Sequence, residues 1–511
     1  MLLAQPDMIK KIDSFAVTTL GIPTRELMLR AGRAVADAVI GNLPKGSGVI
    51  IFAGKGNNGG DGYAAAHLLH TDYDVTVFDV FGAGQSTDEG RYYLDSYLAD
   101  GGVVRKLDFD ADTLGFIKDA DCLIDAVFGT GFKGEYPECA VKLSRVFASH
   151  STAIKIAVDV PLGVNATDGS VDTHALYSAD ITVALGFIKP GLVSYPAKKY
   201  VGKLLYDNIG LQNTAIVNEF EFKDHAIDRE LATSLLPVRE DDTNKGSFGK
   251  LLLITGSQDF PGAARLSLEA ALRSGVGLCT YLGEKELSDA LAVSFPEAIY
   301  KPCSVLHSTD ADLDFICDLA AKHSAILVGS GSSRSDGLYS LVKRLSTTDG
   351  SPLILDADAI NVLAAHTECR ELLRASRRKI ILTPHPLEFA RLTGASVDTV
   401  QAGRLSLAKS FAKDTGTILV LKGAATVVTD GDVTYVNTSG SSALAKAGSG
   451  DVLAGMIASV TASGVEPLSA AALSVYFHGL AADVLADEFS ELGVTPSDLP
   501  REIARQIRKA Q

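Results

Sequence analysis

The feature that most constrains the fold is a repeated order of apolar run, glycine-containing loop and helical segment. Runs rich in Val, Ile and Leu lead directly into small residues at 48–60, 251–257, 325–333 and 419–426. These runs lack polar–apolar alternation, so both faces of each strand are expected to be buried. Helical segments are expected at 63–70, 263–274 and 451–462. This order is typical of parallel α/β architecture.

The chain of 511 residues is long enough for two to four domains, at roughly 100–200 residues per domain. Its most polar interruptions, residues 219–230 and 239–245, place a boundary between 211 and 245. We therefore expect one α/β domain over 1–218 and a second over 228–511. No fixed-period repeat is present.

Composition excludes several classes of function. A net charge of −15 argues against general nucleic-acid binding and against an anionic membrane surface. The six cysteines form no C-x-x-C pair and suit reduced thiols in the cytoplasm. The N-terminus has no apolar signal region. The longest uncharged apolar stretches, 452–465 and 467–482, fall short of the roughly 20 residues of a membrane span and are predicted to be buried helices.

The first glycine loop follows a predicted strand at Val49–Ala53 and precedes a helix from Tyr63. Its backbone amides and the helix N-terminus suit a phosphate. Glycines 54, 56 and 59 match G-x-G-x-x-G, and Asp79 ends the next apolar run, which favours a Rossmann dinucleotide site. The motif is short, so a tight turn without a ligand is the alternative.

Three carboxylates refine this prediction. Asp61 would repel a pyrophosphate, so it is better explained by sugar hydroxyls, a cation or proton transfer. Asp125 and Asp159 end two further predicted strands, and the carboxyl ends of parallel strands form the ligand crevice. The alternative for each of these two residues is a helix N-cap or a solvated loop position.

The segments GKGNNGGDGYAAA, DAVFGTGFKG, AVDVPLGV and LGFIKPG occur in this order. On them, residues 10–210 resemble the N-terminal domain of the NAD(P)HX epimerases, which interconvert the C6 epimers of hydrated nicotinamide cofactors. The resemblance implies a Rossmann-like three-layer sandwich, with Asp159 as acid or base. It implies potassium at Asn58, Asp125 and position 162, where Leu162 replaces the usual Ser and offers only its carbonyl. The substrate contacts that it implies are Asn57, Asn58, Gly59, Gly60, Asp61, Gly129, Thr130, Gly131, Phe132, Lys133, Gly134, Glu135 and Asp159.

In the second half, Ala447–Asp451 directly precedes a predicted helix from Val452. Amides at such a helix start can stabilise a transferring phosphoryl group, and Asp451 could accept the proton of an attacking hydroxyl. The alternative is that Asp451 is a helix N-cap or a first-turn acid favoured by the helix dipole. A strand from Leu419 reaches Lys422 and Gly423, with a hairpin turn at 430–432. No Walker A or protein-kinase motif is present.

The segments KGSFGKLLLITGS, PGAARLSLEAALRSGVG, LILDADAIN, ILTPHPLEFARL, LVLKGAATVV and AKAGSGDVLAGMI follow in order. On them, residues 235–490 resemble the NAD(P)HX dehydratases, which have a ribokinase-like fold. In that family the nucleotide phosphorylates the hydrate, and phosphate then leaves. The resemblance implies hydrate contacts at Ala263, Gly331, His385 and Asp451, with Asp451 as base. It implies nucleotide contacts at Lys422, Gly423, Ala424, Ala425, Thr426 and Gly450.

Two segments depart from the dehydratase pattern. AGSGD replaces AGTGD, a mild change, and VGSGSS at 328–333 replaces the usual GPGLG. His385 lies between two prolines in an extended loop, where a surface role is the alternative to a ligand contact. Asp356 and Asp358 follow one strand, and we expect one to serve the site and the other to cap a helix.

We therefore expect a bifunctional repair enzyme acting on NADHX and NADPHX, with potassium in the first half and Mg²⁺–ADP in the second. The dehydration would yield AMP and phosphate. The resemblance also implies a homo-oligomer, a tetramer or octamer, without nucleic-acid or membrane partners. Two alternatives remain: a Rossmann oxidoreductase fused to a sugar or vitamin kinase, and a noncatalytic nucleotide sensor.

Overall fold

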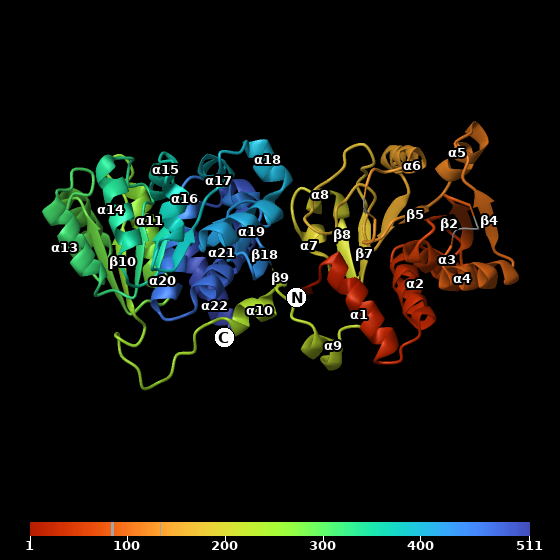
Figure 1. Ribbon diagram of the computed structural model, residues 1–511, viewed down its shortest axis with the longest axis horizontal. Helices are drawn as coiled ribbons and strands as arrows, with labels where there is room; N and C mark the ends of the chain where they lie inside the picture. The colour runs from red at the N-terminus through yellow and green to blue at the C-terminus, as the bar shows by residue number, and fades with distance from the viewer. Residues whose placement is uncertain (83–85, 133) are drawn as a thin grey trace. The chain divides into compact units, whose positions relative to one another are not determined.

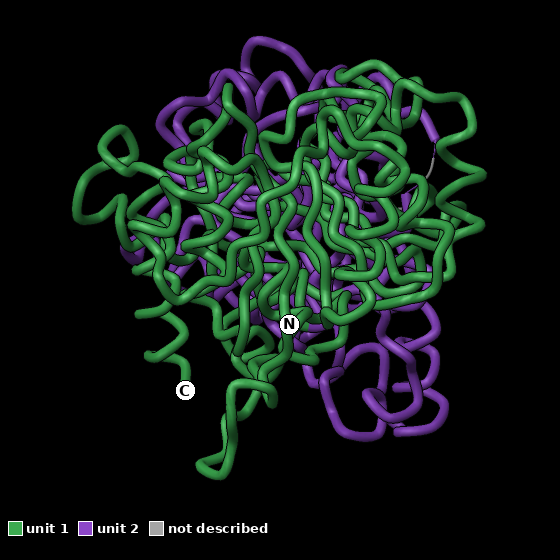
Figure 2. Tube along the Cα trace, turned by 90° about the vertical axis from the view of Figure 1, so that its left-hand side faces the viewer, with its two compact units in different colours: residues 1, 225–511 green, residues 2–224 purple. Residues whose placement is uncertain are grey.

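The computed structural model describes residues 1–82, 86–132 and 134–511. The chain divides into two compact units, residues 2–224 and residues 225–511 together with Met1 (Figures 1 and 2). Each unit is built around its own parallel sheet, as the alternation of apolar runs and helices predicts.

The N-terminal unit contains a seven-stranded parallel sheet in the order β4-β3-β2-β5-β6-β7-β8. Alternate residues of β2 pack into two different cores, Val49 and Ile51 against α2, α3 and α4, and Ile50 and Phe52 against α5 and α6. This is the predicted Rossmann-like three-layer sandwich. The strands are β2 (Gly48–Ala53), β3 (Asp74–Asp79), β4 (Val103–Lys106), β5 (Cys122–Ala126), β6 (Ile154–Val158), β7 (Ile181–Leu185) and β8 (Lys203–Asp207). The helices are α1 (Pro6–Thr18), α2 (Thr24–Ile40), α3 (Asn57–Leu69), α4 (Asp88–Ala99), α5 (Ala111–Lys118), α6 (Glu138–Ser149), α7 (Pro190–Val193), α8 (Lys198–Val201) and α9 (Thr214–Glu219).

The C-terminal unit orders its strands β9-β18-β17-β16-β15-β14-β13-β10-β11-β12. Strands β10 to β16 run parallel, and β16, β17 and β18 pair antiparallel through the predicted hairpin. The strands are β9 (Asp224–Ile227), β10 (Lys250–Ile254), β11 (Leu278–Gly283), β12 (Ile299–Pro302), β13 (Ala325–Val328), β14 (Leu353–Leu355), β15 (Ile380–Leu382), β16 (Ile418–Leu421), β17 (Val427–Thr429) and β18 (Thr434–Asn437). The α-helices are α10 (Arg229–Ser234), α11 (Pro261–Arg273), α12 (Lys285–Ser294), α13 (Asp310–Ala320), α14 (Asp336–Thr347), α15 (Asp358–Ala364), α16 (Cys369–Arg374), α17 (Pro386–Thr393), α18 (Val397–Ala402), α19 (Arg404–Thr415), α20 (Ser449–Ala462), α21 (Pro467–Gly493) and α22 (Leu499–Ala510).

The two long apolar stretches are buried helices, as predicted, but the second is longer than expected. The helix α21 spans 27 residues because it continues past Ala482 into a half-exposed amphipathic end, with a kink at Ser490. By length and composition it could cross a membrane, but 78% of its most apolar window is buried inside the unit. Such burial is typical of a core helix.

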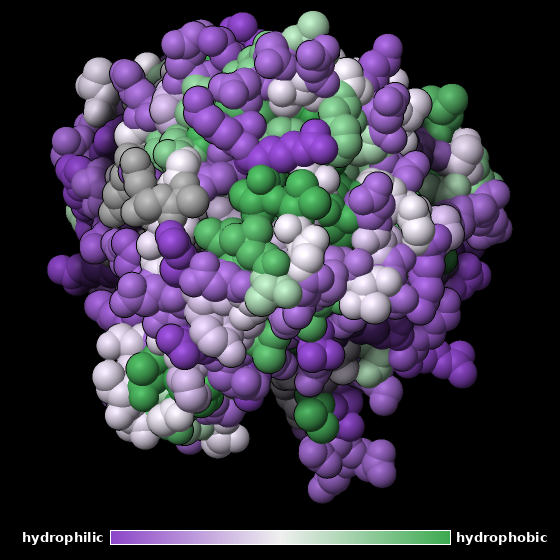
Figure 3. Space-filling model, turned by 90° about the vertical axis from the view of Figure 1, so that its right-hand side faces the viewer, coloured by the Kyte–Doolittle hydropathy of each residue, from purple (hydrophilic) through white to green (hydrophobic). Residues whose placement is uncertain are grey.

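The face of the N-terminal unit around α4, α5 and β4 is mostly hydrophilic, with hydrophobic side chains gathered near its centre (Figure 3). Strand β4 lies at the edge of the sheet, and its last two residues, Arg105 and Lys106, are exposed. Charged residues on an edge strand oppose pairing with other chains.

The sequence predicts an open loop for the first glycine segment, with a helix from Tyr63. In the structure α3 already begins at Asn57, so part of this segment is helical. None of its glycines has a positive φ. They serve close packing: a Cβ at Gly59 would lie 1.9 Å from the carbonyl oxygen of Gly54, and one at Gly54 would lie 1.9 Å from that of Val127. The helix therefore packs directly on the strand ends that carry the loops.

A Gly59→Ala substitution should lower the local stability of this region by about 3 kcal/mol, because backbone atoms block the new methyl group. Hydrogen exchange of the β2 and α3 amides would measure the change as a free energy of opening. Gly56→Ala is the matched control, since a Cβ there meets nothing within 4 Å and its φ is −94°. Equal protection in both variants would contradict the packing argument.

Candidate functional sites

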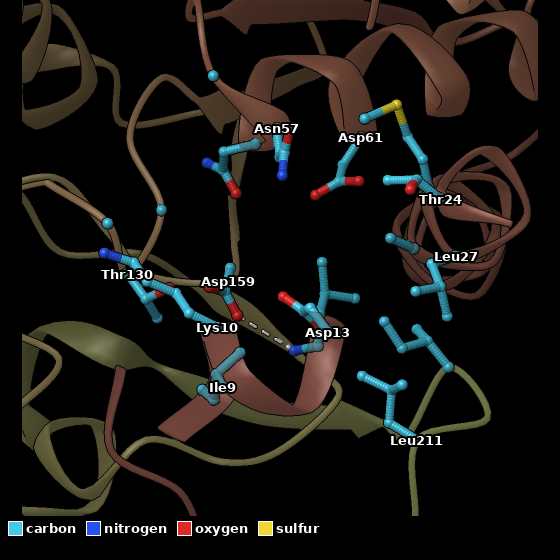
Figure 4. A pocket seen from close by; sticks show the side chains of 18 of the residues that line it. Ile9, Lys10, Asp13, Thr24, Leu27, Asn57, Asp61, Thr130, Asp159 and Leu211 are labelled. Atoms are coloured by element: carbon cyan, nitrogen blue, oxygen red, sulfur yellow. Dashed lines mark hydrogen bonds between the residues drawn. The ribbon is translucent and has the colours of Figure 1, made fainter. Parts of the chain in front are cut away.

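A cavity of about 710 Å³ opens at the carboxyl ends of β2, β5 and β6 in the N-terminal unit. Helix α1, the starts of α2 and α3, and the loop after β5 complete its walls (Figure 4). Apolar side chains such as Ile9 and Leu27 line it together with a few polar groups. Its size suits an organic ligand, since ligand pockets span roughly 300–1,000 Å³.

Asp159 follows β6 in a left-handed conformation, with a φ of 66°. Its carboxylate accepts a short hydrogen bond from Lys189 Nζ and a second from the Leu185 amide at 3.3 Å. Lys189 also donates to the Leu185 carbonyl at 2.8 Å and has a side chain that is only 1% exposed. A strained backbone and a buried ion pair together fix one carboxylate at the cavity wall, as is common in active sites.

Asp13 from α1 and Asp61 from α3 point into the same space as Asp159 (Figure 4). Burial raises the pKa of Asp13 to about 6; Lys189 opposes this rise, and Asp159 adds to it. Burial also holds the pKa of Asp61 well above its usual value, and the charges of Asp159 and Asp13 add to this. The cavity therefore holds two carboxyl groups whose pKa values lie above those of exposed aspartates.

Asp125 ends β5 and is fully buried. Its oxygens accept from the Val127 amide at 3.2 Å, the Leu162 amide at 2.9 Å and the Tyr177 hydroxyl at 3.0 Å. Within the described part of the chain, no ion pair joins it. Burial raises its pKa to about 6. Oxygen ligands and an uncompensated buried carboxylate fit a hard cation such as potassium.

In the C-terminal unit, Asp451 lies in the first turn of α20, after Gly448 at a φ of 102°. Burial raises the pKa of Asp451 to about 7, with Asp356, Asp358 and Glu388 adding to the effect and Lys422 opposing it. A carboxyl group with this pKa is suited to exchange protons at neutral pH.

Lys422, at the end of β16, faces this helix start. A Cβ on Gly450 would lie 3.2 Å from its Nζ. The Nζ donates to Asp356 at 3.0 Å, and Asp356 also accepts from Thr383 at 2.6 Å and Ser330 at 2.8 Å. Burial opposes the charge of Lys422, but Asp356 and Glu388 raise its pKa. A fixed cation therefore lies beside the amides of α20, as an anion site requires.

The loop after Lys422 is held from behind by Arg404, whose side chain is buried. The guanidinium donates to the carbonyls of Leu421 and Lys422, each at 3.1 Å. A Cβ on Gly423 would meet it at 2.9 Å, and the φ of Gly423 is 135°. Arg404 therefore positions the loop, and neither a side chain nor an ordinary φ is tolerated at Gly423.

Comparison with known proteins matches a YjeF-related N-terminal family at residues 24–191 and an NAD(P)H-hydrate dehydratase family at residues 251–505. The bifunctional NAD(P)H-hydrate repair enzyme of Moorella thermoacetica is 34% identical, and the match covers 96% of this chain and 93% of that protein. The chain belongs to the family of bifunctional NAD(P)H-hydrate repair enzymes.

Two further relatives of this repair-enzyme family support the assignment. The Escherichia coli repair enzyme is 31% identical over 96% of this chain and 91% of its own length. The crystal structure of the ADP/ATP-dependent NAD(P)H-hydrate dehydratase of Bacillus subtilis, co-crystallised with ATP and Mg²⁺, matches with a TM-score of 0.50 and 32% identity. It covers 56% of this chain and 99% of that structure. A ribokinase-like superfamily protein of Enterococcus faecalis matches with a TM-score of 0.50 and 23% identity over 57% of this chain and 98% of that structure, which confirms the predicted ribokinase-like fold.

The repair-enzyme residues expected in the N-terminal unit are only partly brought together. Those that line the cavity are Asn57, Asn58, Asp61, Gly129, Thr130, Gly131, Phe132 and Asp159. Gly59 and Gly60 are buried in packing contacts, while Gly134 and Glu135 are exposed and lie outside the cavity lining. Lys133 lies outside the described residues. Asp79 also lies outside the lining and accepts from the amides of Phe81 and Gly82, so it closes a turn.

In the C-terminal unit, Ala263 and Gly331 lie together, since a Cβ on Gly331 would meet that of Ala263 at 2.5 Å. His385 caps α17, and its Nδ1 accepts from the Leu387 and Glu388 amides. Its Nε2 lies 3.4 Å from Glu388 Oε1, and its side chain remains half exposed, so part of the ring is still accessible to a ligand. Asp356 accepts from Lys422, whereas the prediction that the other aspartate caps a helix is wrong: Asp358 lies in the first turn of α15, whose N-cap residue is Ala357.

Three functional candidates were not singled out as such from the sequence. Lys189 lies within the LGFIKPG segment, but nothing in the pattern pairs it with Asp159. Arg404 and Asp13 lie outside every motif. Their burial and their neighbours identify them only in the folded chain.

Proposed function

We propose that residues 1–218 form an NAD(P)H-hydrate epimerase domain and residues 228–511 an ADP-dependent NAD(P)H-hydrate dehydratase domain. The observation that carries the second assignment is the partly buried Asp451 carboxyl in the first turn of α20, next to Gly450, which faces Lys422. The first assignment is supported by the cavity with its fixed Asp159.

In the dehydratase, hydroxide is a poor leaving group and phosphate a good one. Asp451 takes the proton of the C6 hydroxyl as that oxygen attacks the terminal phosphorus of ADP. Lys422 and the α20 amides stabilise the charge on the transferring phosphoryl group. The bond from C6 to the phosphate oxygen then breaks with the ring-nitrogen lone pair forming an iminium bond to C6. Loss of a proton from C5 forms the C5–C6 double bond, so the products are AMP, phosphate and NAD(P)H. Mg²⁺ bound to ADP neutralises phosphate charge.

The proposed hydrate contacts in this domain are Ala263, Gly331, His385 and Asp451. The loop Lys422–Thr426 and Gly450 are proposed to hold the nucleotide. Arg404 positions the nucleotide loop, because its guanidinium donates to the carbonyls of Leu421 and Lys422.

In the epimerase, Asp159 is proposed as the acid or base at C6. Its pairing with Lys189 supports this role because the buried ammonium holds the carboxylate in one position at the cavity wall. Contacts from the lining residues Asn57, Asn58 and Asp61 and from Gly129–Phe132 would hold the cofactor around it.

The test is recovery of NADH from mixed epimers of its hydrate with Mg²⁺–ADP, followed by the near-ultraviolet absorbance of NADH. Full recovery with release of free phosphate supports both activities. A stable phosphate ester would indicate a sugar or vitamin kinase, and hydride transfer with an alcohol would indicate an oxidoreductase. Binding without turnover would indicate a nucleotide sensor.

Potassium is proposed to bind at Asn58, Asp125 and the Leu162 carbonyl, where it would supply positive charge beside the cavity. Replacing potassium by tetramethylammonium should lower epimerisation several-fold and leave dehydration of the S epimer unchanged. Asp125→Asn should remove the response to potassium. An equal response of both reactions would indicate a general salt effect instead.

We also propose a homo-oligomer, a tetramer or octamer, in the cytoplasm. Light scattering of the purified chain tests the assembly. The six cysteines are free in the structure, which suits a reducing compartment.

A further inference from the structure

Two carboxyl groups in the N-terminal cavity lack protein partners. Among the described residues, the carboxyl groups of Asp13 and Asp61 take part in no hydrogen bond and no ion pair. Both line the cavity and point into it (Figure 4). A carboxyl group that packs against protein without a partner is costly, so groups left open toward a cavity indicate a role toward its ligand.

Among the described residues of the cavity lining, carboxyl groups outnumber buried ammonium groups. Lys189 is committed to Asp159 by a direct hydrogen bond and is the buried cation of the site. Lys10 and Lys55 also line the cavity, but both are exposed. Three clustered carboxyls cannot all ionise beside one buried ammonium, so at least one of them remains a proton donor.

We propose that Asp13 is the general acid of the epimerase and acts together with Asp159 as the base. This inference rests on the proposed epimerase function. Helix α1 supplies one group and the loop after β6 supplies the other, so the two approach the ligand from separate elements. Epimerisation needs such a pair, because the hydroxyl leaves one ring face and water adds to the other.

The step balances without a redox partner. The Asp13 carboxyl gives its proton to the C6 hydroxyl, the C6–O bond breaks, and water leaves. The lone pair of the ring nitrogen forms an iminium bond to C6. Water then attacks the opposite face, the iminium pair returns to nitrogen, and the proton of the attacking water goes to Asp159. In the reverse direction the two carboxyls exchange roles.

Asp13 suits the acid role better than Asp61. A pKa of about 6 places Asp13 near the working pH, where an acid both gives and regains its proton efficiently. Burial and the charges of Asp159 and Asp13 hold the pKa of Asp61 well above its usual value, which suits a hydrogen-bond donor toward the ligand better than a group that cycles its proton. Asp13 is also only partly buried, so its carboxyl can exchange its proton with solvent.

The test uses the full chain and the pure R epimer without ADP, so that only epimerisation is measured. Asp13→Asn should lower kcat about 100-fold. In the parent, the rate should fall as the pH rises through about 6, because the acid loses its proton, and this fall should be absent in the variant. Asp7→Asn, an exposed change on the same helix, is the matched control and should retain the parent profile.

Dehydration of the S epimer with ADP, together with the thermal transition of the N-terminal unit, reports folding of each variant. A rate for Asp13→Asn within about threefold of the parent overturns the proposal. So does a slow variant that keeps the fall near pH 6, since the lost rate would then be structural. If the parent itself does not exceed the uncatalysed rate, the proposed epimerase function fails, and this inference fails with it.

Discussion

Replacing Asp451 by asparagine should lower the recovery of NADH from the S epimer about 1,000-fold, within the range for loss of a general base. Asparagine keeps the size of the side chain, and α20 loses no cap because its N-cap residue is Gly448, but asparagine cannot accept the proton of the hydroxyl. ADP binding should stay within about threefold of the parent, because the loop and Lys422 are unchanged. Rapid-quench turnover and calorimetric binding measure the two quantities.

Asp398→Asn is the matched control, since Asp398 is also a first-turn acid, in α18, but is exposed. It should leave turnover unchanged. A slow Asp451 variant that has also lost ADP binding would indicate a positioning role, and an active one would remove the proposed base.

The expected pH dependence of the dehydratase rate follows from the carboxyl group of Asp451. Burial and the neighbouring carboxylates raise the pKa of Asp451 to about 7. A base acts when deprotonated, so kcat/KM for the hydrate should rise with pH below about 7 and level off above it. A profile that falls over this range would contradict the assignment, because it would require a protonated Asp451.

The sequence was sufficient to predict the strands and the order of the domains, because strands buried on both faces carry a long apolar run. It was also sufficient to place Asp159 and Asp451, since each ends or begins an element at the functional edge of its sheet. The sequence did not show why the first segment requires glycine at positions 54 and 59. Gly54 and Gly59 are needed for the close approach of α3 to two strand ends, a contact between residues far apart in the chain.

Ion pairs between residues of separate elements could not be predicted from the sequence either. The Lys189–Asp159 pair joins β6 to the segment after β7, and the contact of Lys422 with Asp356 joins residues 66 positions apart. Pairing of this kind is set by strand order in the sheet, which no local pattern specifies. For the same reason Asp79 fits a dinucleotide motif by spacing, whereas its carboxylate closes the turn after β3.

Asp159→Asn should stop epimerisation while sparing dehydration, so that recovery of NADH ends once the S epimer is consumed. The rate of R-to-S conversion should fall at least 100-fold. Asparagine tolerates the left-handed conformation at this position about as well as aspartate does, so the backbone is not the cause of the loss. Chromatography of the residual hydrate should find the R epimer alone.

Mixing the two inactive proteins gives the decisive comparison. The Asp159 variant retains a working dehydratase and the Asp451 variant a working epimerase, so an equal mixture should restore full recovery. Released R and S epimers then pass between molecules through solution. Full recovery by the Asp159 variant alone would show that another group carries the epimerisation. Failure of the mixture, with each remaining activity intact, would show that substrate moves between the two sites of one assembly without release.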